Sequence, residues 1–257
     1  MESIVLSVVL PVYNEEKSIQ KVVFDHVRVL EQIQNQISGW EIVCLDDAST
    51  DNTPQILAAV SKGMANMRIV RHPQNQGIYK TYMDLFKEAR GTHIYQTASD
   101  GQWPAENCAR MLKALIQSQA DLLIGVRENR REIYSPWRRL LSFVFNGIPK
   151  LFFHLDTKDA NGIKLGRREI FRLNLISKSF FGEIERIVLA RAMNCQVSYC
   201  PIDFLPRVEG KAKGANFLNI AATLNDFFRY VMIYFSPRWK AYFQSRGQQF
   251  SNEKYLS

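Results

Sequence analysis

The sequence predicts an α/β fold, with helices on both faces of a mostly parallel central sheet. Apolar runs typical of buried strands alternate with segments of helical periodicity at intervals of about 25 residues, the pattern of parallel sheets with crossover helices. Three of these runs end in polar or acidic residues, and ligands bind at the carboxyl ends of strands in such sheets. With 257 residues, of which 46% are hydrophobic, the chain can bury the core of one large domain or of a domain with an appendage.

The first half of the chain shows this alternation most clearly. Val5–Val12 is a continuous run rich in β-branched residues, as expected for a strand buried on both faces. Further strands are predicted at Trp40–Leu45, Met67–His72, His93–Thr97 and Asp121–Gly125. The helices between them are predicted at Lys17–Gln36, Pro54–Val60, Gln76–Ala89 and Pro104–Gln117.

After Gly125 the chain becomes richer in aromatic residues. Trp137–Leu155 predicts a helix that is interrupted near Gly147 and Pro149. A strand and a helix are predicted within Gly162–Leu175, a helix at Glu183–Met193, a strand at Gln196–Cys200 and a long helix at Phe217–Phe235. We expect residues 1–215 to form the sheet domain, and residues 216–257 to form a C-terminal amphipathic helix and polar tail that face a membrane or a dimer partner.

The net charge indicates the kind of partner, and the cysteines indicate the cellular compartment. The 33 Lys and Arg against 25 Asp and Glu give a formal net charge of +8, which favours an anionic partner. An aromatic-basic RNA motif is missing from the sequence, so we do not expect a nucleic-acid partner. The four cysteines have no CxxC spacing and are expected to be buried thiols in a reducing, cytoplasmic compartment. Neither a signal peptide nor a membrane-spanning helix is expected.

Three motifs follow three of the predicted strands. They are Pro11-Val-Tyr-Asn-Glu-Glu16, Asp46-Asp-Ala-Ser-Thr-Asp51 and Ser99-Asp-Gly-Gln102. Acidic residues gathered at the strand ends suit a diphosphate that is linked to a metal ion, because hard divalent cations prefer oxygen ligands. Taken alone, the Asp46 segment is equally compatible with a solvated turn that caps the next helix.

Together the three motifs resemble the family-2 inverting glycosyltransferases, and in particular the branch of dolichyl- and polyprenyl-phosphate sugar synthases. The resemblance implies a GT-A type fold, a nucleotide-sugar donor that is UDP- or GDP-linked, and a divalent metal ion, Mg²⁺ or Mn²⁺. It also implies that the nucleoside is held by Pro11, Tyr13, Glu15, Asp46 and Asp47.

The third motif departs from the family pattern. Asp100 and Gln102 match the metal-binding Asp-x-Asp segment and the residues after it, but Ala98 stands where the first aspartate is usual. The resemblance therefore leaves Asp100 as the metal ligand and catalytic residue, with Gln102 on the donor side. Ala98 has three open explanations: a natural variant that tolerates one carboxylate, an inactive relative, or an engineered substitution.

Basic residues in the second half resemble the family's phosphate-binding segments. Arg127 and Arg139 match a segment that meets the donor diphosphate and an acceptor phosphate, and guanidinium groups suit both. The resemblance implies that Arg127 binds the donor and that Arg139 is a catalytic residue. Arg207 and Lys213 match a basic loop that closes over the diphosphate, although Ala212 replaces its serine. Asp159 matches an aspartate beside the acceptor.

These observations predict inverting transfer of a sugar from a nucleotide-sugar donor, most readily to a polyprenyl phosphate at the inner face of the membrane. The segments Trp137–Leu155 and Phe217–Phe243 carry basic and aromatic residues that suit helices lying on anionic lipid, and equally suit packing on the sheet or at a dimer interface. Two alternatives stay open. One is transfer to a glycan hydroxyl with Asp159 as the base, and the other is a catalytically silent nucleotide-sugar-binding relative.

Overall fold

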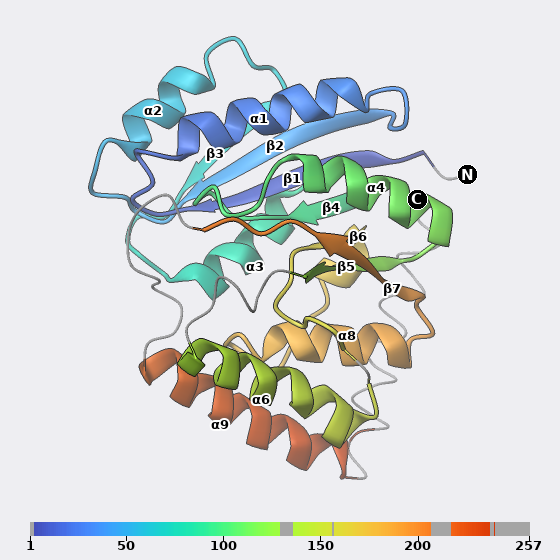
Figure 1. The fold of residues 1–257 in the computed structure, drawn as a ribbon. Helices are drawn as coiled ribbons and strands as arrows, with labels where there is room; N and C mark the ends of the chain where they lie inside the picture. The colour runs from blue at the N-terminus through green and yellow to red at the C-terminus, as the bar shows by residue number, and fades with distance from the viewer. Residues whose placement is uncertain (1–2, 129–135, 156, 207–216, 237–238, 240–257) are drawn as a thin grey trace.

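The computed structural model describes residues 3–128, 136–155, 157–206, 217–236 and 239. Seven strands are described: β1 Val5–Val12, β2 Gly39–Asp46, β3 Met67–Arg71, β4 His93–Gln96, β5 Leu122–Arg127, β6 Lys164–Arg167 and β7 Val197–Ile202. The helices of the described residues are α1 Ile19–Gln32, α2 Thr53–Val60, α3 Ile78–Glu88, α4 Glu106–Ser118, α6 Pro136–Phe153, α7 Arg168–Phe171, α8 Gly182–Ala192 and α9 Phe217–Tyr234. The predicted mostly parallel sheet flanked by helices is confirmed (Figure 1).

The strands form one sheet in the order β3-β2-β1-β4-β6-β5-β7. All neighbouring strands are parallel except β6, which runs antiparallel to both β4 and β5. The carboxyl ends of β1, β2, β4, β5 and β7 therefore lie along one edge of the sheet, and β6 begins at that edge. The motifs that follow β1, β2 and β4 are gathered there.

Two apolar cores lie on opposite faces of the sheet. Along β1, Leu6, Val8 and Leu10 pack into the core beneath α1, α2 and α4, whereas Val9 packs into the core that α3, α7 and α8 cover. This alternation follows from the period of two in a strand that is buried on both faces. Figure 1 shows the same layering, with α1, α2 and α4 on one side and α3 and α8 on the other.

Helices α6 and α9 form a further layer outside α8 (Figure 1). Phe152 of α6 contacts Phe227 of α9, with 5.0 Å between ring centroids, and Phe153 packs against Phe181 at the start of α8. The predicted interruption of α6 near Gly147 and Pro149 is wrong, because the helix continues to Phe153 with Pro149 inside it. Side chains on both sides of the proline pack into the same core, which offsets the hydrogen bond that a proline removes.

Candidate active site

The carboxyl edge of the sheet brings together most of the residues that the sequence singled out. Pro11 is the second-last residue of β1, with Tyr13 and Glu15 just beyond the strand; Asp46 ends β2 and Asp47 follows it. Residues from the other strands at this edge are Asp100 and Gln102 after β4, Arg127 at the end of β5 and Asp159 shortly before β6. Arg139 is exposed in the first part of α6, and Arg207 and Lys213 lie outside the described residues.

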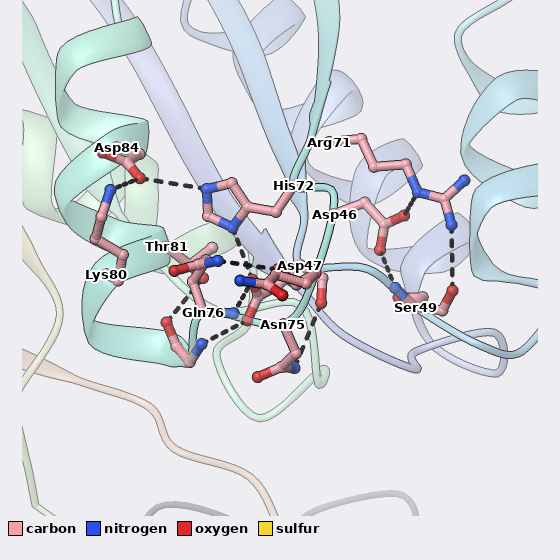
Figure 2. A network of polar contacts seen from close by, with 12 residues as sticks. Asp46, Asp47, Ser49, Arg71, His72, Asn75, Gln76, Lys80, Thr81 and Asp84 are labelled. Atoms are coloured by element: carbon pink, nitrogen blue, oxygen red, sulfur yellow. Dashed lines mark hydrogen bonds and ion pairs between the residues drawn. The ribbon is translucent and has the colours of Figure 1, made fainter.

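Asp47 organises the segment that leads into α3. Its two carboxylate oxygens accept hydrogen bonds from the backbone N–H groups of Gln76 (2.8 Å) and Gly77 (2.9 Å). Gly77 precedes the helix with φ of +82°, a conformation that favours glycine. Asp47 is 3% exposed and holds this turn through these hydrogen bonds (Figure 2).

His72 links Asp47 to a second carboxylate. Its Nδ1 lies 2.7 Å from Asp47 Oδ1, and its Nε2 lies 3.2 Å from Asp84 Oδ2 on α3 (Figure 2). Asp84 also pairs with Lys80 and Lys87, so the chain of contacts runs from the strand end to the surface of α3. The pKa of Asp84 lies below its ordinary value: burial would raise it, but hydrogen bonds and the charges of the two lysines outweigh that effect.

The Asp46 carboxylate also contacts other groups of the protein. Its Oδ1 accepts the backbone N–H of Ser49 at 2.9 Å, and its Oδ2 lies 3.2 Å from Arg71 Nε in an ion pair (Figure 2). With 1% of its surface exposed, Asp46 shapes the turn after β2. Both Asp46 and Asp47 thus contact neighbouring protein groups, and the nucleoside contact implied for them stays a prediction.

The loops after β1 and β2 are joined to each other by side chains. Asn14 N donates to Ser49 Oγ at 2.9 Å, and Asn14 Oδ1 accepts from Thr50 N at 2.8 Å. Glu15 N donates to Thr53 Oγ1 at 2.8 Å, and its carboxylate accepts from Ser18 Oγ at 2.7 Å. Tyr13 and Glu15 are only partly buried, so they remain on the open side of this pair of loops.

The segment after β4 alternates between buried and partly exposed residues. Ser99 is 4% exposed and donates to the carbonyl of Pro11 at 2.6 Å, which ties the segment to β1. Ala98 and Asp100, on either side of it, are both partly exposed. Position 98 is therefore partly accessible, as Asp100 is.

Asp100 suits a metal ion that is shared with a ligand. Among the described residues, no three His, Cys, Asp or Glu side chains are grouped so as to hold a metal by themselves. Magnesium is commonly bound through one or two carboxylates together with substrate phosphates. A single partly exposed carboxylate at a strand end fits that arrangement, in which a diphosphate supplies the remaining oxygen ligands.

Gln102 joins this segment to the residues that follow β7. Its Nε2 donates to the carbonyl of Leu205 at 3.0 Å, and Leu205 N donates back to the carbonyl of Gln102 at 2.8 Å. The next residue, Trp103, packs on Phe204 with 4.6 Å between ring centroids. Gln102, expected on the donor side, is 7% exposed and holds the backbone of this neighbouring segment.

Arg127 and Asp159 form a buried bidentate ion pair. Arg127 Nε lies 2.7 Å from Asp159 Oδ2, and its Nη2 lies 2.6 Å from Oδ1. The guanidinium carbon also lies 5.4 Å from the ring centroids of both Trp103 and Phe204, within cation–π range. Asp159 is fully buried, so its carboxylate is used to hold Arg127.

Trp103 and Phe204 were missed by the sequence analysis as site residues. Trp103 stands directly after the Asp100-Gly-Gln102 segment, and that adjacency was the available signal. The sequence around Phe204 gave no such signal, because its proximity to Trp103 and Arg127 arises from the pairing of β5 with β7.

The chain is similar to a known family and to named relatives. Residues 7–175 match Glycosyl transferase family 2. Over 233 residues the chain is 24% identical to dolichyl-phosphate beta-glucosyltransferase ALG5A of Trichomonas vaginalis, covering 86% of this chain and 72% of that protein. Over 144 residues it is 31% identical to undecaprenyl-phosphate 4-deoxy-4-formamido-L-arabinose transferase of Pseudomonas paraeruginosa, covering 55% of this chain but only 40% of that protein.

A solved structure shares the fold. Glucosyl-3-phosphoglycerate synthase from Mycobacterium tuberculosis, in complex with Mn²⁺, UDP and glucosyl-3-phosphoglycerate, superposes with a TM-score of 0.63 at 16% identity. The match covers 88% of this chain and 80% of that one. The predicted GT-A type fold is confirmed by this likeness.

Proposed function

The chain belongs to glycosyl transferase family 2 and is a glycosyltransferase; on this premise we propose that it transfers a sugar from a UDP- or GDP-linked donor to a polyprenyl phosphate, with inversion at the anomeric carbon. Support for the donor class comes from the sheet edge itself, where the loops after β1 and β2 are fastened together beside Asp100. In this proposal Asp46 and Asp47 shape those loops, and Pro11, Tyr13 and Glu15 meet the nucleoside.

The single observation that carries the choice of acceptor is the pairing of Asp159 with Arg127. Transfer to a sugar hydroxyl requires a base to remove its proton. Asp159, the base expected for that reaction, is fully buried and gives an oxygen to each of two Arg127 nitrogens. A phosphate monoester is already a nucleophile near neutral pH, so transfer to a polyprenyl phosphate proceeds without such a base.

The chemistry is then a single displacement that releases a nucleoside diphosphate. A divalent metal ion, Mg²⁺ or Mn²⁺, would be held by Asp100 and would supply positive charge to the leaving diphosphate. Arg207 and Lys213 are proposed to contact the same phosphates, and Arg139 to meet the acceptor phosphate. Arg127 was expected on the donor side, but it is held by Asp159 and by two aromatic rings. Because Asp159 is expected beside the acceptor, we assign the Arg127 guanidinium to the acceptor side instead.

A lipid acceptor requires a surface that meets the membrane, and α6 and α9 offer one. Large apolar side chains on these helices, and one just after α9, are between 46% and 78% exposed: Phe143, Leu151, Leu224, Phe228, Met232 and Phe235. Exposed basic residues stand among them, including Lys150 and Arg229, as suits an interfacial helix on anionic lipid. None of the described helices has both the length and the apolarity to cross a bilayer. We propose peripheral contact, with the inner, cytoplasmic face of the membrane as its predicted location.

Ala98 favours one alternative, a relative that binds nucleotide sugars without turning them over. Thermal unfolding with UDP- and GDP-sugars, each with and without Mn²⁺, separates the two, because a ligand that binds the folded state raises its stability. We expect one nucleotide class to stabilise the protein, more so with Mn²⁺, and release of nucleoside diphosphate when a polyprenyl phosphate is added. Binding without release would support the silent relative.

Two substitutions test the metal site. Asp100→Asn is expected to abolish the Mn²⁺-dependent part of the stabilisation while the protein stays folded, because Asp100 is only partly buried. Ala98→Asp adds a second carboxylate two residues before Asp100, at a partly exposed position, and is expected to tighten Mn²⁺ binding. Unchanged Mn²⁺ dependence in both variants would refute the role given to Asp100.

Membrane contact is tested by co-sedimentation with vesicles of anionic and of zwitterionic lipid. The double variant Phe228→Ser/Met232→Ser removes apolar surface from α9. The control Phe24→Ser removes another exposed aromatic ring, from α1 on the opposite side of the sheet. We expect the parent and Phe24→Ser to sediment with anionic vesicles and the double variant to stay in solution. Equal sedimentation of all three would refute this surface.

A further inference from the structure

A fully buried lysine stands at the beginning of β6. Lys164 Nζ lies 2.9 Å from the carbonyl of Ala160, 3.1 Å from that of Gly162 and 2.6 Å from Glu183 Oε2 on α8. The two carbonyls accept hydrogen bonds from the ammonium group, and Glu183 forms an ion pair with it. Lys164 is 0% exposed, and none of the donor or acceptor roles described above involves it.

Two of the three oxygens belong to the turn that carries Asp159. Gly162 N donates to the carbonyl of Asp159 at 3.0 Å, which closes the turn, and Lys164 holds the carbonyls of Ala160 and Gly162 on its inner side. From the outer side, Asn146 Oδ1 of α6 accepts the backbone N–H of Ala160 at 2.8 Å. The turn therefore has a fixed position relative to β6, α6 and α8.

The partner of Lys164 is itself a buried charge. Burial would raise the pKa of Glu183, but the charges of Lys164 and Arg186 and hydrogen bonds from Lys164 and Gln96 hold it below its ordinary value. Glu183 is thus ionised opposite the ammonium. Replacing a buried ion pair with apolar residues is often neutral or stabilising, so stability alone gives little reason for this pair.

We propose that Lys164 and Glu183 are positioning residues, which fix the Asp159 turn so that Arg127 is presented to the acceptor in one orientation. The inference rests on the proposed transferase function. Lys164 acts through the two carbonyls, Asp159 through its bidentate contact with Arg127, and Glu183 by holding the ammonium in place. None of these groups needs to touch the substrate.

The test compares the parent with Lys164→Met, Lys164→Arg and Lys164→Met/Glu183→Met. The Arg variant keeps donors for the two carbonyls, whereas both Met variants remove them. We expect kcat to fall by about tenfold or more in the Met variants, equivalent to about 1.4 kcal/mol, with the donor KM little changed and with partial rescue by Arg. If Lys164 contributed only to stability, kcat of the variants would instead fall in the same order as their melting temperatures.

Arg68→Met/Glu41→Met is the matched control. It removes a less buried ion pair, in which Arg68 Nε lies 3.1 Å from Glu41 Oε2, near the amino ends of β2 and β3 and away from the site. We expect this control to lose stability without losing kcat at a temperature where it is folded. If the double variant at 164 and 183 does not fold, Glu183→Gln replaces it in the same comparison.

Hydrogen exchange of the peptide covering 157–163 supplies a readout that does not depend on activity. We expect faster exchange there in the Met variants and no change in the Arg68 control. Exchange and kcat both equal to those of the parent would overturn the positioning role. A parent that binds no nucleotide sugar would overturn the proposed function instead, while the exchange measurement would still decide whether Lys164 fixes the turn.

Discussion

Gln102 and Leu205 are joined by two hydrogen bonds that run in opposite directions, although 103 residues separate them along the chain. The side-chain amide of Gln102 donates to the Leu205 carbonyl, and the Leu205 N–H donates to the Gln102 carbonyl. The segment that carries Asp100 is thereby fastened to the one that leads toward Arg207. The two halves of the proposed donor site are coupled through this pair.

Gln102→Ala is expected to lower transfer more than stability. The substitution removes the side-chain bond and leaves the Leu205 carbonyl without that donor, at a cost of about 1–2 kcal/mol. We expect a modest loss in urea unfolding free energy and a clear loss of kcat/KM for the donor. Gln117→Ala, at an exposed position of α4, is the control and should change neither. Parent-like kcat/KM in Gln102→Ala would show that this link is dispensable.

Asp47→Asn is expected to destabilise the turn before α3. Asp47 accepts from two backbone N–H groups and contacts His72, and an amide cannot accept from all three partners. Hydrogen bonds to charged groups contribute about 1.5–3 kcal/mol, so we expect a loss of about 2 kcal/mol in urea unfolding.

Asp25→Asn is the control for that measurement, because it makes the same substitution at an aspartate that pairs with Lys21 at the surface of α1. Surface pairs contribute about 0–1 kcal/mol. If the two variants lose equal stability, Asp47 does not hold the turn as described. Weaker stabilisation by nucleotide sugars in Asp47→Asn alone would link the turn to donor binding.

The strand-end motifs allowed the site to be located from sequence because parallel strands place their carboxyl ends at one edge. Pro11, Asp46 and Asp100 were expected at that edge, and the pairing of β1 with β2 and β4 brings their segments together. The direction in which a carboxylate turns does not follow from strand periodicity. Asp46 and Asp159 are turned to Arg71 and Arg127, which come from other parts of the chain.

The direction of β6 and the continuity of α6 depend on tertiary packing and could not be predicted from the sequence pattern. A strand was expected within residues 162–175, but apolar alternation carries no information on its direction, and β6 runs antiparallel to both neighbours. The break expected in α6 failed for a related reason. Pro149 disfavours a helix interior locally, whereas Phe145, Ile148 and Phe152 pack into one core only if the helix continues.

Replacing glycine by alanine is expected to lower stability at Gly162 and to raise it at Gly147. A Cβ at Gly162 would lie 1.9 Å from the carbonyl oxygen of Gly125, a backbone atom of β5. Overpacking of this kind costs about 1–3 kcal/mol or more, so Gly162→Ala should lower the melting temperature and impair transfer.

A Cβ at Gly147, exposed within α6, meets nothing within 4 Å. Gly147→Ala should raise stability by about 0.5–1 kcal/mol, and a loss there would contradict the continuous helix.

Protonation of Glu183 is expected to account for part of the stability that the protein loses in acid. Its pKa in the folded protein lies below its ordinary value of 4.5, because Lys164 and Arg186 favour the ionised form more than burial disfavours it. The ion pair therefore stabilises the fold fully above the unfolded pKa, and this contribution is lost as pH falls through the lower folded value.

Glu183→Gln removes that titration and leaves Lys164 without its counter-charge. Breaking a buried pair in this way costs about 3–5 kcal/mol at neutral pH. We expect the difference in urea unfolding free energy between parent and variant to be constant from about pH 7 to pH 5.5 and to shrink below about pH 4.5. Glu31→Gln, at an exposed position of α1, should differ little from the parent throughout. A difference that stays constant or grows in acid would mean that Glu183 is not held ionised by Lys164.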